Sequence, residues 1–177
     1  VEVAKMSLSL KIIDSYMPSD FGAVGILGSQ ILKDVGTNIK CGNSLVGNDV
    51  LTLYPSLAND IEQLQATNAF DWYAAFPNVF ENGGFDYVVG NPPYVEVKNY
   101  NMALPYMASY VKHVFASSKN GKIDLAVPFI EQGVRLLNEH GRLGYIVQKR
   151  FFKADYGKGI RKLLTTGHLL NGIYDYE

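Results

Sequence analysis

The chain has 177 residues, of which 47% are hydrophobic and 19% are charged, and its formal net charge is −1. These values exclude a disordered chain and a strongly basic nucleic-acid binder, and they predict about one soluble globular domain. The single cysteine, Cys41, excludes an internal disulfide, and the three histidines show no zinc-ligand spacing. No window approaches the roughly 18 apolar residues of a membrane span. We therefore expect a reducing, cytoplasmic setting.

Charge is unevenly distributed along the sequence. Residues 41–97 contain seven acidic residues and no Lys or Arg, whereas residues 142–162 contain seven basic residues and one acid, Asp155. A basic segment of this kind can contact phosphate groups, and a solvated surface is the alternative.

Four features are predicted in the first half of the chain. Apolar residues at helical spacing predict a helix over residues 1–15, and residues 21–36 are typical of a glycine-rich loop with a short helix. A short strand is predicted at residues 39–41, followed by a turn. A helix is predicted at residues 57–75, and Pro77 limits it.

The second half is predicted to alternate strands with helices. Its clearest element is a helix with an apolar stripe, which Asp124 caps and Gly141 follows. The predicted strands are residues 85–89, 143–147 and 172–176, the predicted helices are residues 103–118, 124–138 and 158–166, and residues 149–157 are predicted to form a loop. This alternation predicts an α/β fold with a mostly parallel sheet and helices on both faces.

The strand at residues 85–89 ends in an unusual turn, Asn91-Pro92-Pro93-Tyr94. Two consecutive prolines stiffen the backbone and donate no hydrogen bond, and strand ends in open α/β sheets are where ligands bind. The Asn91 side-chain carbonyl and a backbone carbonyl beside proline can accept both hydrogens of an amino group, while Tyr94 can stack on a planar ring. The turn therefore predicts a site that activates a weak planar amine, such as the exocyclic amine of adenine or a side-chain amide. An ordinary strand-ending turn with Tyr94 packed is the alternative.

The stretch DYVVGNPPY resembles motif IV of S-adenosylmethionine-dependent amino-group methyltransferases, above all the N6-adenine DNA methyltransferases. The resemblance extends to VEVAKMSLSL, NIKCGNSLVG, FDWYAAFPNVFENGGFDYVVGNPPYVE and DLAVPFIEQGVRLLNEHGRLGYIVQKRF, which are similar to the large type IIG restriction–modification enzymes and their phage-defence relatives. In order and spacing, these matches cover nearly the whole chain. The resemblance implies a Rossmann-like class I methyltransferase sheet.

The resemblance implies a role for the residues of the turn. Asn91 would accept from the adenine amine through its side chain, and Pro92 would accept through its main-chain carbonyl, with Pro93 part of the same rigid turn. Tyr94 would stack on the adenine after the base is flipped out of the duplex. The amine would attack the sulfonium methyl of S-adenosylmethionine directly, with positioning and desolvation as the main catalytic terms and no metal or covalent intermediate.

The resemblance also implies part of a cofactor wall. Asn43, with Ser44 and Leu45 beside it, matches a turn near the cofactor adenine, and Phe129 matches an aromatic residue that packs against that adenine. The alternatives are a turn in which Asn43 caps its own backbone and a Phe129 that belongs to the plain core.

A basic, aromatic stretch predicts a loop that faces DNA. Lys149, Arg150 and Lys153 flank the pair Phe151-Phe152 just after a predicted strand end, where nucleic acid could contact them. A packed pair of Phe rings with solvated charges is the alternative.

Some motifs of the family have no match. Glycine-rich motif I and acidic motif II are expected upstream of Val1, because FGAVGILG at residues 21–28 follows a loop and not an apolar strand. A target-recognition domain is expected beyond Glu177, and a restriction nuclease, fused or separate, is an expected partner. We therefore expect residues 1–177 to be a partial methyltransferase catalytic domain, incomplete on its N-terminal side. Alone, it should bind S-adenosylmethionine weakly or not at all and show no turnover.

The leading prediction is methylation of adenine N6 in double-stranded DNA by a restriction–modification or phage-defence enzyme. Protein glutamine methyltransferases of the release-factor type share the NPPY turn, and RNA methylation uses the same chemistry. A non-catalytic DNA-binding module is the prediction from a different class.

Overall fold

The computed structural model describes residues 3, 6–8, 11, 38–119, 123–167 and 169–175. The chain forms two units, Val1–Gly42 and Asn43–Glu177. In the first unit, residues 3, 6–8 and 11 are helical, in agreement with the predicted N-terminal helix at those positions. The predicted loop at residues 21–36 lies outside the described residues, and so does FGAVGILG. Among the described residues, no helix is long and apolar enough to cross a membrane.

The second unit consists of short helices around a pair of strands. Its strands are β1 (Phe85–Gly90) and β2 (Leu137–Tyr145), and its α-helices are α3 (Val50–Leu53), α4 (Ile61–Thr67), α5 (Trp72–Ala75), α6 (Pro77–Glu81), α7 (Tyr100–Ala103), α8 (Pro105–Val114), α9 (Ala126–Leu136), α10 (Arg150–Lys153) and α11 (Lys158–Thr166). Its 3-10 helices are Pro55–Asn59, Val97–Asn99, Ala116–Ser118 and Asp155–Gly157.

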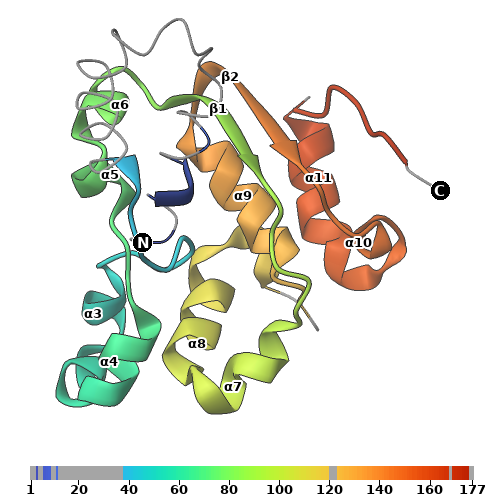
Figure 1. Ribbon diagram of the computed structural model, residues 1–177. Helices are drawn as coiled ribbons and strands as arrows, with labels where there is room; N and C mark the ends of the chain where they lie inside the picture. Colours follow the sequence, from blue (N-terminus) through green and yellow to red (C-terminus); the bar gives the residue numbers. More distant parts are fainter. Residues whose placement is uncertain are drawn as a thin grey trace, which may run out of the picture. The chain divides into compact units, whose positions relative to one another are not determined.

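The two strands run parallel and side by side, with α9 in the connection between them (Figure 1). The register pairs Gly90 with Tyr145 at the carboxyl ends. The Ile146 N–H extends the ladder by donating to the Gly90 carbonyl oxygen at 3.1 Å. Because the strands are parallel, the segments that follow them leave from the same edge. The turn that begins at Asn91 therefore lies beside the residues that follow β2.

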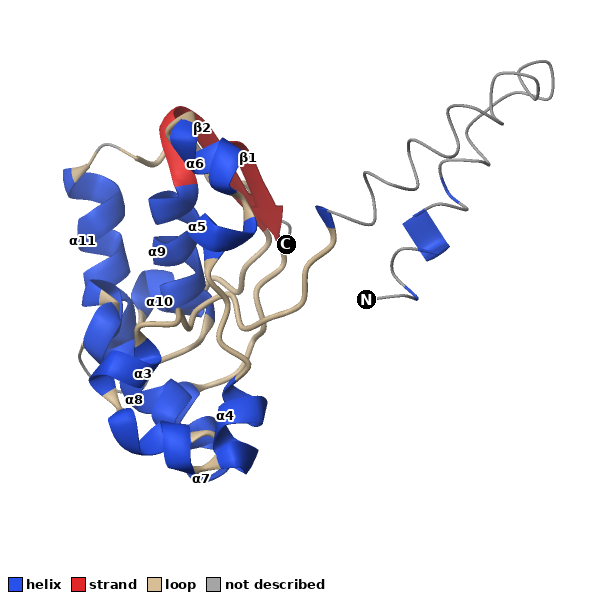
Figure 2. Cartoon of the chain, turned by 90° about the vertical axis from the view of Figure 1, so that its left-hand side faces the viewer, coloured by secondary structure: helices blue, strands red, loops and turns tan. Residues whose placement is uncertain are grey.

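The two faces of this strand pair differ in burial. Figure 2 shows α9 on one side of the pair, and a Cβ atom on Gly133 of α9 would lie 2.6 Å from Leu143 Cδ1, so helix and strand are in close contact. On the opposite face, Tyr87, Val89 and Ile146 are 74%, 80% and 71% exposed. Parallel sheets normally bury both faces. Within the described residues, helices therefore cover one face where two covered faces were predicted, and a Rossmann-like sheet stays a prediction.

Aspartate side chains fix the starts of three helices. Asp60 accepts from a backbone amide of α4 at 3.0 Å, and Asp71 accepts from two backbone amides of α5. Asp124 accepts from the Ala126 amide at 2.9 Å, but the N-cap of α9 is Leu125, so Asp124 binds the first turn from one residue before the cap position that was predicted for it. Such caps satisfy the otherwise unpaired amides of a first helical turn.

The core of the second unit is built mainly from α8, α9 and the segments packed on them. Its buried apolar residues are Leu45, Val46, Val50, Leu57, Val97, Met107, Ala108, Tyr110, Val111, Phe115, Ile123, Leu125, Val127, Ile130, Phe151 and Ile160.

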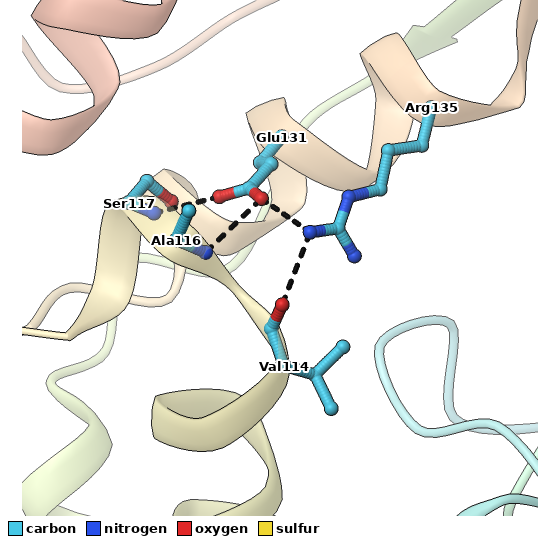
Figure 3. A network of polar contacts seen from close by, with 5 residues as sticks. All are labelled: Val114, Ala116, Ser117, Glu131 and Arg135. Carbon is cyan, nitrogen blue, oxygen red and sulfur yellow. Dashed lines mark hydrogen bonds and ion pairs between the residues drawn. The ribbon is translucent and has the colours of Figure 1, made fainter.

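A buried carboxylate joins α9 to the end of α8 (Figure 3). Glu131 is 2% exposed and accepts from the amides of Ala116 and Ser117 at 3.1 and 2.8 Å. Arg135 Nη2 lies 2.5 Å from the same carboxylate and donates to the Val114 carbonyl oxygen at 3.0 Å. The charge of Glu131 is therefore both paired and hydrogen-bonded, as a buried charge requires.

Two predicted elements in the first half of the chain are wrong. Residues 39–41 form no strand, and Asn43 instead makes an isolated parallel bridge with Ala69. The predicted helix at residues 57–75 is divided into a 3-10 helix, α4 and α5. The division follows from the helix starts at Asp60 and Asp71 and from the left-handed backbone of Asn68, whose φ is 46°.

In the second half, β1, α9 and α11 are confirmed, and several boundaries differ from the prediction. The helix predicted at residues 103–118 is interrupted at Leu104, because the residue before a proline is disfavoured in helical conformation. β2 begins at Leu137, so α9 ends before Gly141. The loop predicted at residues 149–157 contains α10 and a 3-10 helix, and the described part of the strand predicted at residues 172–176 has no regular structure.

Candidate active site

The NPPY turn lies at the carboxyl end of β1, next to the carboxyl end of β2. Pro92 is buried, whereas Asn91, Pro93 and Tyr94 are exposed. The turn thus presents an amide and an aromatic ring at the edge of the strands where α/β proteins bind ligands.

The side chains of Tyr94 and Asn91 contact each other. The Tyr94 hydroxyl donates to Asn91 Oδ1 and also lies 3.2 Å from the Ile146 carbonyl oxygen. A hydroxyl has one hydrogen to donate, so the two acceptors share it. Asn91 Oδ1, the side-chain oxygen, keeps a second lone pair for another donor. The alternative of a packed Tyr94 is met only in part, because the residue is bonded through its hydroxyl and is 41% exposed.

The chain after the turn is tied to the segment before α9. The Val95 carbonyl oxygen accepts from the Leu125 amide at 2.9 Å, and the Val97 amide donates to the Ile123 carbonyl oxygen at 2.7 Å. The turn is therefore anchored on both sides, by the strand pair before it and by this antiparallel bridge after it. Fixed acceptors of this kind lose little entropy when a ligand binds.

Charged side chains gather around Tyr156, which lies in the 3-10 helix after α10. Burial raises the pKa of Tyr156, the negative charges of Asp124 and Glu96 raise it further, and the positive charge of Arg150 opposes them. Asp124 and Glu96 belong to the bridge that holds the NPPY turn. The charge of Arg150, in the predicted DNA-facing segment, and the charges of the two acids in the bridge thus all act on the Tyr156 pKa.

The turn at Asn43, Ser44 and Leu45 is fixed by its own side chain and by distant partners. Asn43 Oδ1 accepts from the Leu45 amide at 3.2 Å, and the Asn43 amide donates to the Asn68 carbonyl oxygen at 2.7 Å. The indole N–H of Trp72 donates to the Ser44 carbonyl oxygen at 3.1 Å. The predicted alternative, in which Asn43 caps its own backbone, is therefore observed. Asn43 Oδ1 still has a second lone pair to offer to a ligand amine.

Phe129 lies in α9 and is half-buried against the core that includes Leu45. This position fits the alternative of a core residue. Among the described residues, no hydrogen bond joins the Asn43 turn to the NPPY turn. Phe129 therefore packs against the core cluster that contains Leu45. The Asn43 turn and the NPPY turn are held by separate sets of hydrogen bonds.

Tyr110 of α8 supports the segment after the Asn43 turn. The Gly47 amide donates to the Tyr110 hydroxyl at 3.2 Å, and that hydroxyl donates to Asp49 Oδ1 at 2.6 Å. Burial raises the pKa of Tyr110 to about 12, and the hydrogen bond to Asp49 adds to the rise.

The sequence reasoning missed both supports of this region. Nothing in the sequence pairs Tyr110 with Asp49, because the two residues are far apart in the chain. For Trp72 one local signal was present: it follows Asp71, a residue type that caps helices and so fixes the side chain that comes next.

The basic segment follows the carboxyl end of β2, at the same edge as the NPPY turn. Arg150 and Lys153 are exposed, and Lys149 forms an ion pair of 3.4 Å with Asp175. Phe151 is 3% exposed and anchors α10 in the core. Phe151 is thus packed, as the alternative predicted. Arg150 and Lys153 are exposed, as a DNA-facing loop requires.

Comparison with known proteins identifies one family. The model of the Eco57I restriction-modification methylase family matches residues 1–177. The type II restriction enzyme and methyltransferase RM.Eco57I of Escherichia coli is 33% identical over 150 residues, which are 84% of this chain and 13% of that protein. The type II methyltransferase M.BstVI of Geobacillus stearothermophilus is 40% identical over 93 residues, which are 51% of this chain and 16% of that protein. The aligned residues therefore make up less than a fifth of the length of either relative. No solved structure matches the chain.

Proposed function

Because the chain belongs to the Eco57I restriction-modification methylase family, we propose that it carries the catalytic turn of a site-specific DNA methyltransferase. The proposed reaction transfers a methyl group from S-adenosylmethionine to the N6 amino group of adenine in double-stranded DNA. The setting is a restriction–modification or phage-defence enzyme of type IIG character. Target-recognition and nuclease parts, fused or separate, would complete it; the relative RM.Eco57I is both a type II restriction enzyme and a methyltransferase.

The observation that carries the proposal is the NPPY turn at the carboxyl end of β1, with Asn91 and Tyr94 exposed and in contact. In the proposed complex, Asn91 Oδ1 and the Pro92 carbonyl oxygen accept the two hydrogens of the adenine amine. Their direction sets the nitrogen lone pair out of the plane of the ring, which raises its nucleophilicity. Tyr94 leaves Asn91 and stacks on the flipped base, a contact worth about 1–3 kcal/mol.

The proposed cofactor is S-adenosylmethionine, which supplies an electrophilic methyl group on its sulfonium sulfur. The Asn43 turn suits its adenine ring, since Asn43 Oδ1 has a second lone pair for an adenine amine. Phe129 would contribute apolar surface at the edge of the core. Ser44 and Leu45 would hold the turn in place.

The proposed DNA contacts come from the basic segment. Arg150 and Lys153 are exposed at the edge that carries the NPPY turn, so they can meet the phosphates that flank a flipped base. Lys149 can join them by leaving Asp175, because an exposed ion pair of this kind contributes little stability.

The proposal is tested by transfer of a radiolabelled methyl group, using the native protein that contains this chain. Duplex DNA, RNA and a peptide release factor serve as parallel acceptors. The matched variants are Asn91→Ala and Asn99→Ala, since Asn99 is also exposed and its side chain caps no helix. We expect label in duplex DNA with the wild type and with Asn99→Ala, and about 100-fold less with Asn91→Ala, a loss typical of one removed transition-state contact.

Each other result has a distinct meaning. Label in the release factor would replace DNA by a protein amide as the substrate, and label in RNA alone would replace it by RNA. Duplex binding without label in any acceptor would leave a binding module without catalysis.

A further inference from the structure

We propose that Trp72 is a positioning residue for the cofactor, acting through the Ser44–Leu45 peptide group on Asn43. The inference rests on the proposed function, in which the Asn43 turn holds the cofactor adenine. Trp72 itself need not touch the cofactor.

A single peptide group links Trp72 to Asn43. The Ser44 carbonyl and the Leu45 amide belong to the same planar unit, so their directions are fixed relative to each other. The carbonyl accepts from Trp72 Nε1 at 3.1 Å, and the amide donates to Asn43 Oδ1 at 3.2 Å. The indole therefore sets the orientation of the group that orients the Asn43 carboxamide.

The two hydrogen bonds also reinforce each other. A peptide carbonyl that accepts a hydrogen bond polarises the N–H of the same peptide group, which strengthens the bond that this N–H donates. Trp72 thus acts on Asn43 through both geometry and polarisation. Without the indole N–H, the peptide plane loses one of the bonds that orient it, and the remaining lone pair of Asn43 Oδ1 is held less firmly in its direction.

Trp72 is itself held from two sides. Asp71 accepts from the amides of Tyr73 and Ala74, at 3.0 Å each, and thereby fixes the backbone on both sides of Trp72. The indole ring packs edge-on against Phe70 and Phe85, with ring centroids 5.0 and 6.1 Å apart, and it stacks against Phe76 at 6.0 Å.

This support makes the indole a fixed donor and not an adaptable surface group. Phe85 is the first residue of β1. The same indole that supports the Asn43 turn therefore also packs on the strand that carries the NPPY turn.

The alternative is that Trp72 contributes only to packing. A packing role depends on the ring, whereas a positioning role depends on the N–H. Replacement of Trp72 by benzothienylalanine, which has sulfur in place of the indole N–H and nearly the same shape, separates the two. Tyr73→Phe is the matched control, since Tyr73 is the neighbouring aromatic and is 63% exposed.

The experiment measures S-adenosylmethionine affinity by titration calorimetry on the native protein that contains this chain, together with thermal stability and duplex affinity without cofactor. We expect the benzothienylalanine protein to bind S-adenosylmethionine about 3–10-fold more weakly, as for one lost neutral hydrogen bond. Its duplex affinity and melting temperature should stay close to those of the wild type. Tyr73→Phe should leave all three values unchanged.

The outcomes that overturn the inference differ from those that overturn the proposed function. Equal cofactor affinity in the wild-type and benzothienylalanine proteins would overturn the positioning role alone. If cofactor affinity, duplex affinity and the melting temperature all fall in the benzothienylalanine protein, Trp72 contributes only to packing. If the wild type itself does not bind S-adenosylmethionine, the proposed function fails, and this inference fails with it.

Discussion

The buried carboxylate of Glu131 allows a stability prediction worked from its contacts. Glu131→Gln keeps the shape of the side chain but replaces one acceptor oxygen by a donor NH2 group. That group must face either a backbone amide, such as that of Ser117, or the guanidinium of Arg135 (Figure 3). The substitution therefore leaves at least one buried N–H without an acceptor.

The magnitude follows from two contributions. A buried donor without a partner costs about 1–3 kcal/mol. Loss of the ion pair with Arg135, whose side chain is 41% exposed, adds about 0.5–1 kcal/mol in the range of partly solvated pairs. We expect the free energy of unfolding to fall by about 1.5–4 kcal/mol in total.

Urea denaturation followed by circular dichroism measures this loss. With an m value of about 2 kcal/mol/M, the unfolding midpoint should fall by about 0.8–2 M. Arg135→Lys is the control, because it keeps the positive charge and leaves the two backbone amides bound to Glu131. Its midpoint should change by less than about 0.3 M. Equal effects of the two substitutions, or a Glu131→Gln midpoint equal to that of the wild type, would refute the reasoning.

Three further predictions follow from other contacts. Folding raises the pKa of Tyr110 from 10.0 to about 12, so Tyr110 contributes stability below pH 10 that is lost as the pH rises toward 12. The urea midpoint of the wild type should therefore fall more steeply between pH 10 and 12 than that of Tyr110→Phe. Parallel curves of midpoint against pH would contradict this. Gly84→Ala should lower the unfolding free energy by more than about 1 kcal/mol, because Gly84 has a φ of 125° and a Cβ atom would lie 2.7 Å from the Leu136 carbonyl oxygen; an unchanged melting temperature would argue against this close approach. Arg150→Ala and Lys153→Ala should each reduce the salt slope of duplex binding by about 1, and unchanged slopes measured by fluorescence anisotropy would place the DNA elsewhere.

The sequence predicted the elements whose signal is local. β1 is an apolar run closed by Gly90 and two prolines, α9 has an apolar stripe with Asp124 at its start, and both are observed. The location of the NPPY turn at a strand end followed from the same run. Such signals depend on residues a few positions apart, so no knowledge of the tertiary structure is needed to interpret them.

Elements that depend on competing local signals were predicted less well. Residues 57–75 have a helical composition, but Asp60 and Asp71 each start a new helix, and Asn68 adopts a left-handed conformation between them. The periodic pattern predicted one helix because it gave no weight to these polar residues. A reading that treated each Asp as a possible cap would have predicted the division.

Contacts between distant segments were outside the reach of the sequence. The bond from Trp72 to Ser44 and the bond from Tyr110 to Asp49 join segments with no common pattern. They nevertheless determine how the Asn43 turn and the segment after it are held. The family could thus be predicted from short motifs, whereas the bonds that hold the Asn43 turn became visible only in the structure.

The most direct test of the central claim is to identify the methylated base. Duplex DNA is incubated with the native protein that contains this chain and with S-adenosylmethionine bearing a deuterated methyl group, and the nucleosides are then analysed by mass spectrometry beside an Asn91→Ala reaction. We expect deuterated N6-methyladenine with the wild type and about 100-fold less with Asn91→Ala. Deuterated methyl on another base, or equal N6-methyladenine from both proteins, would contradict it.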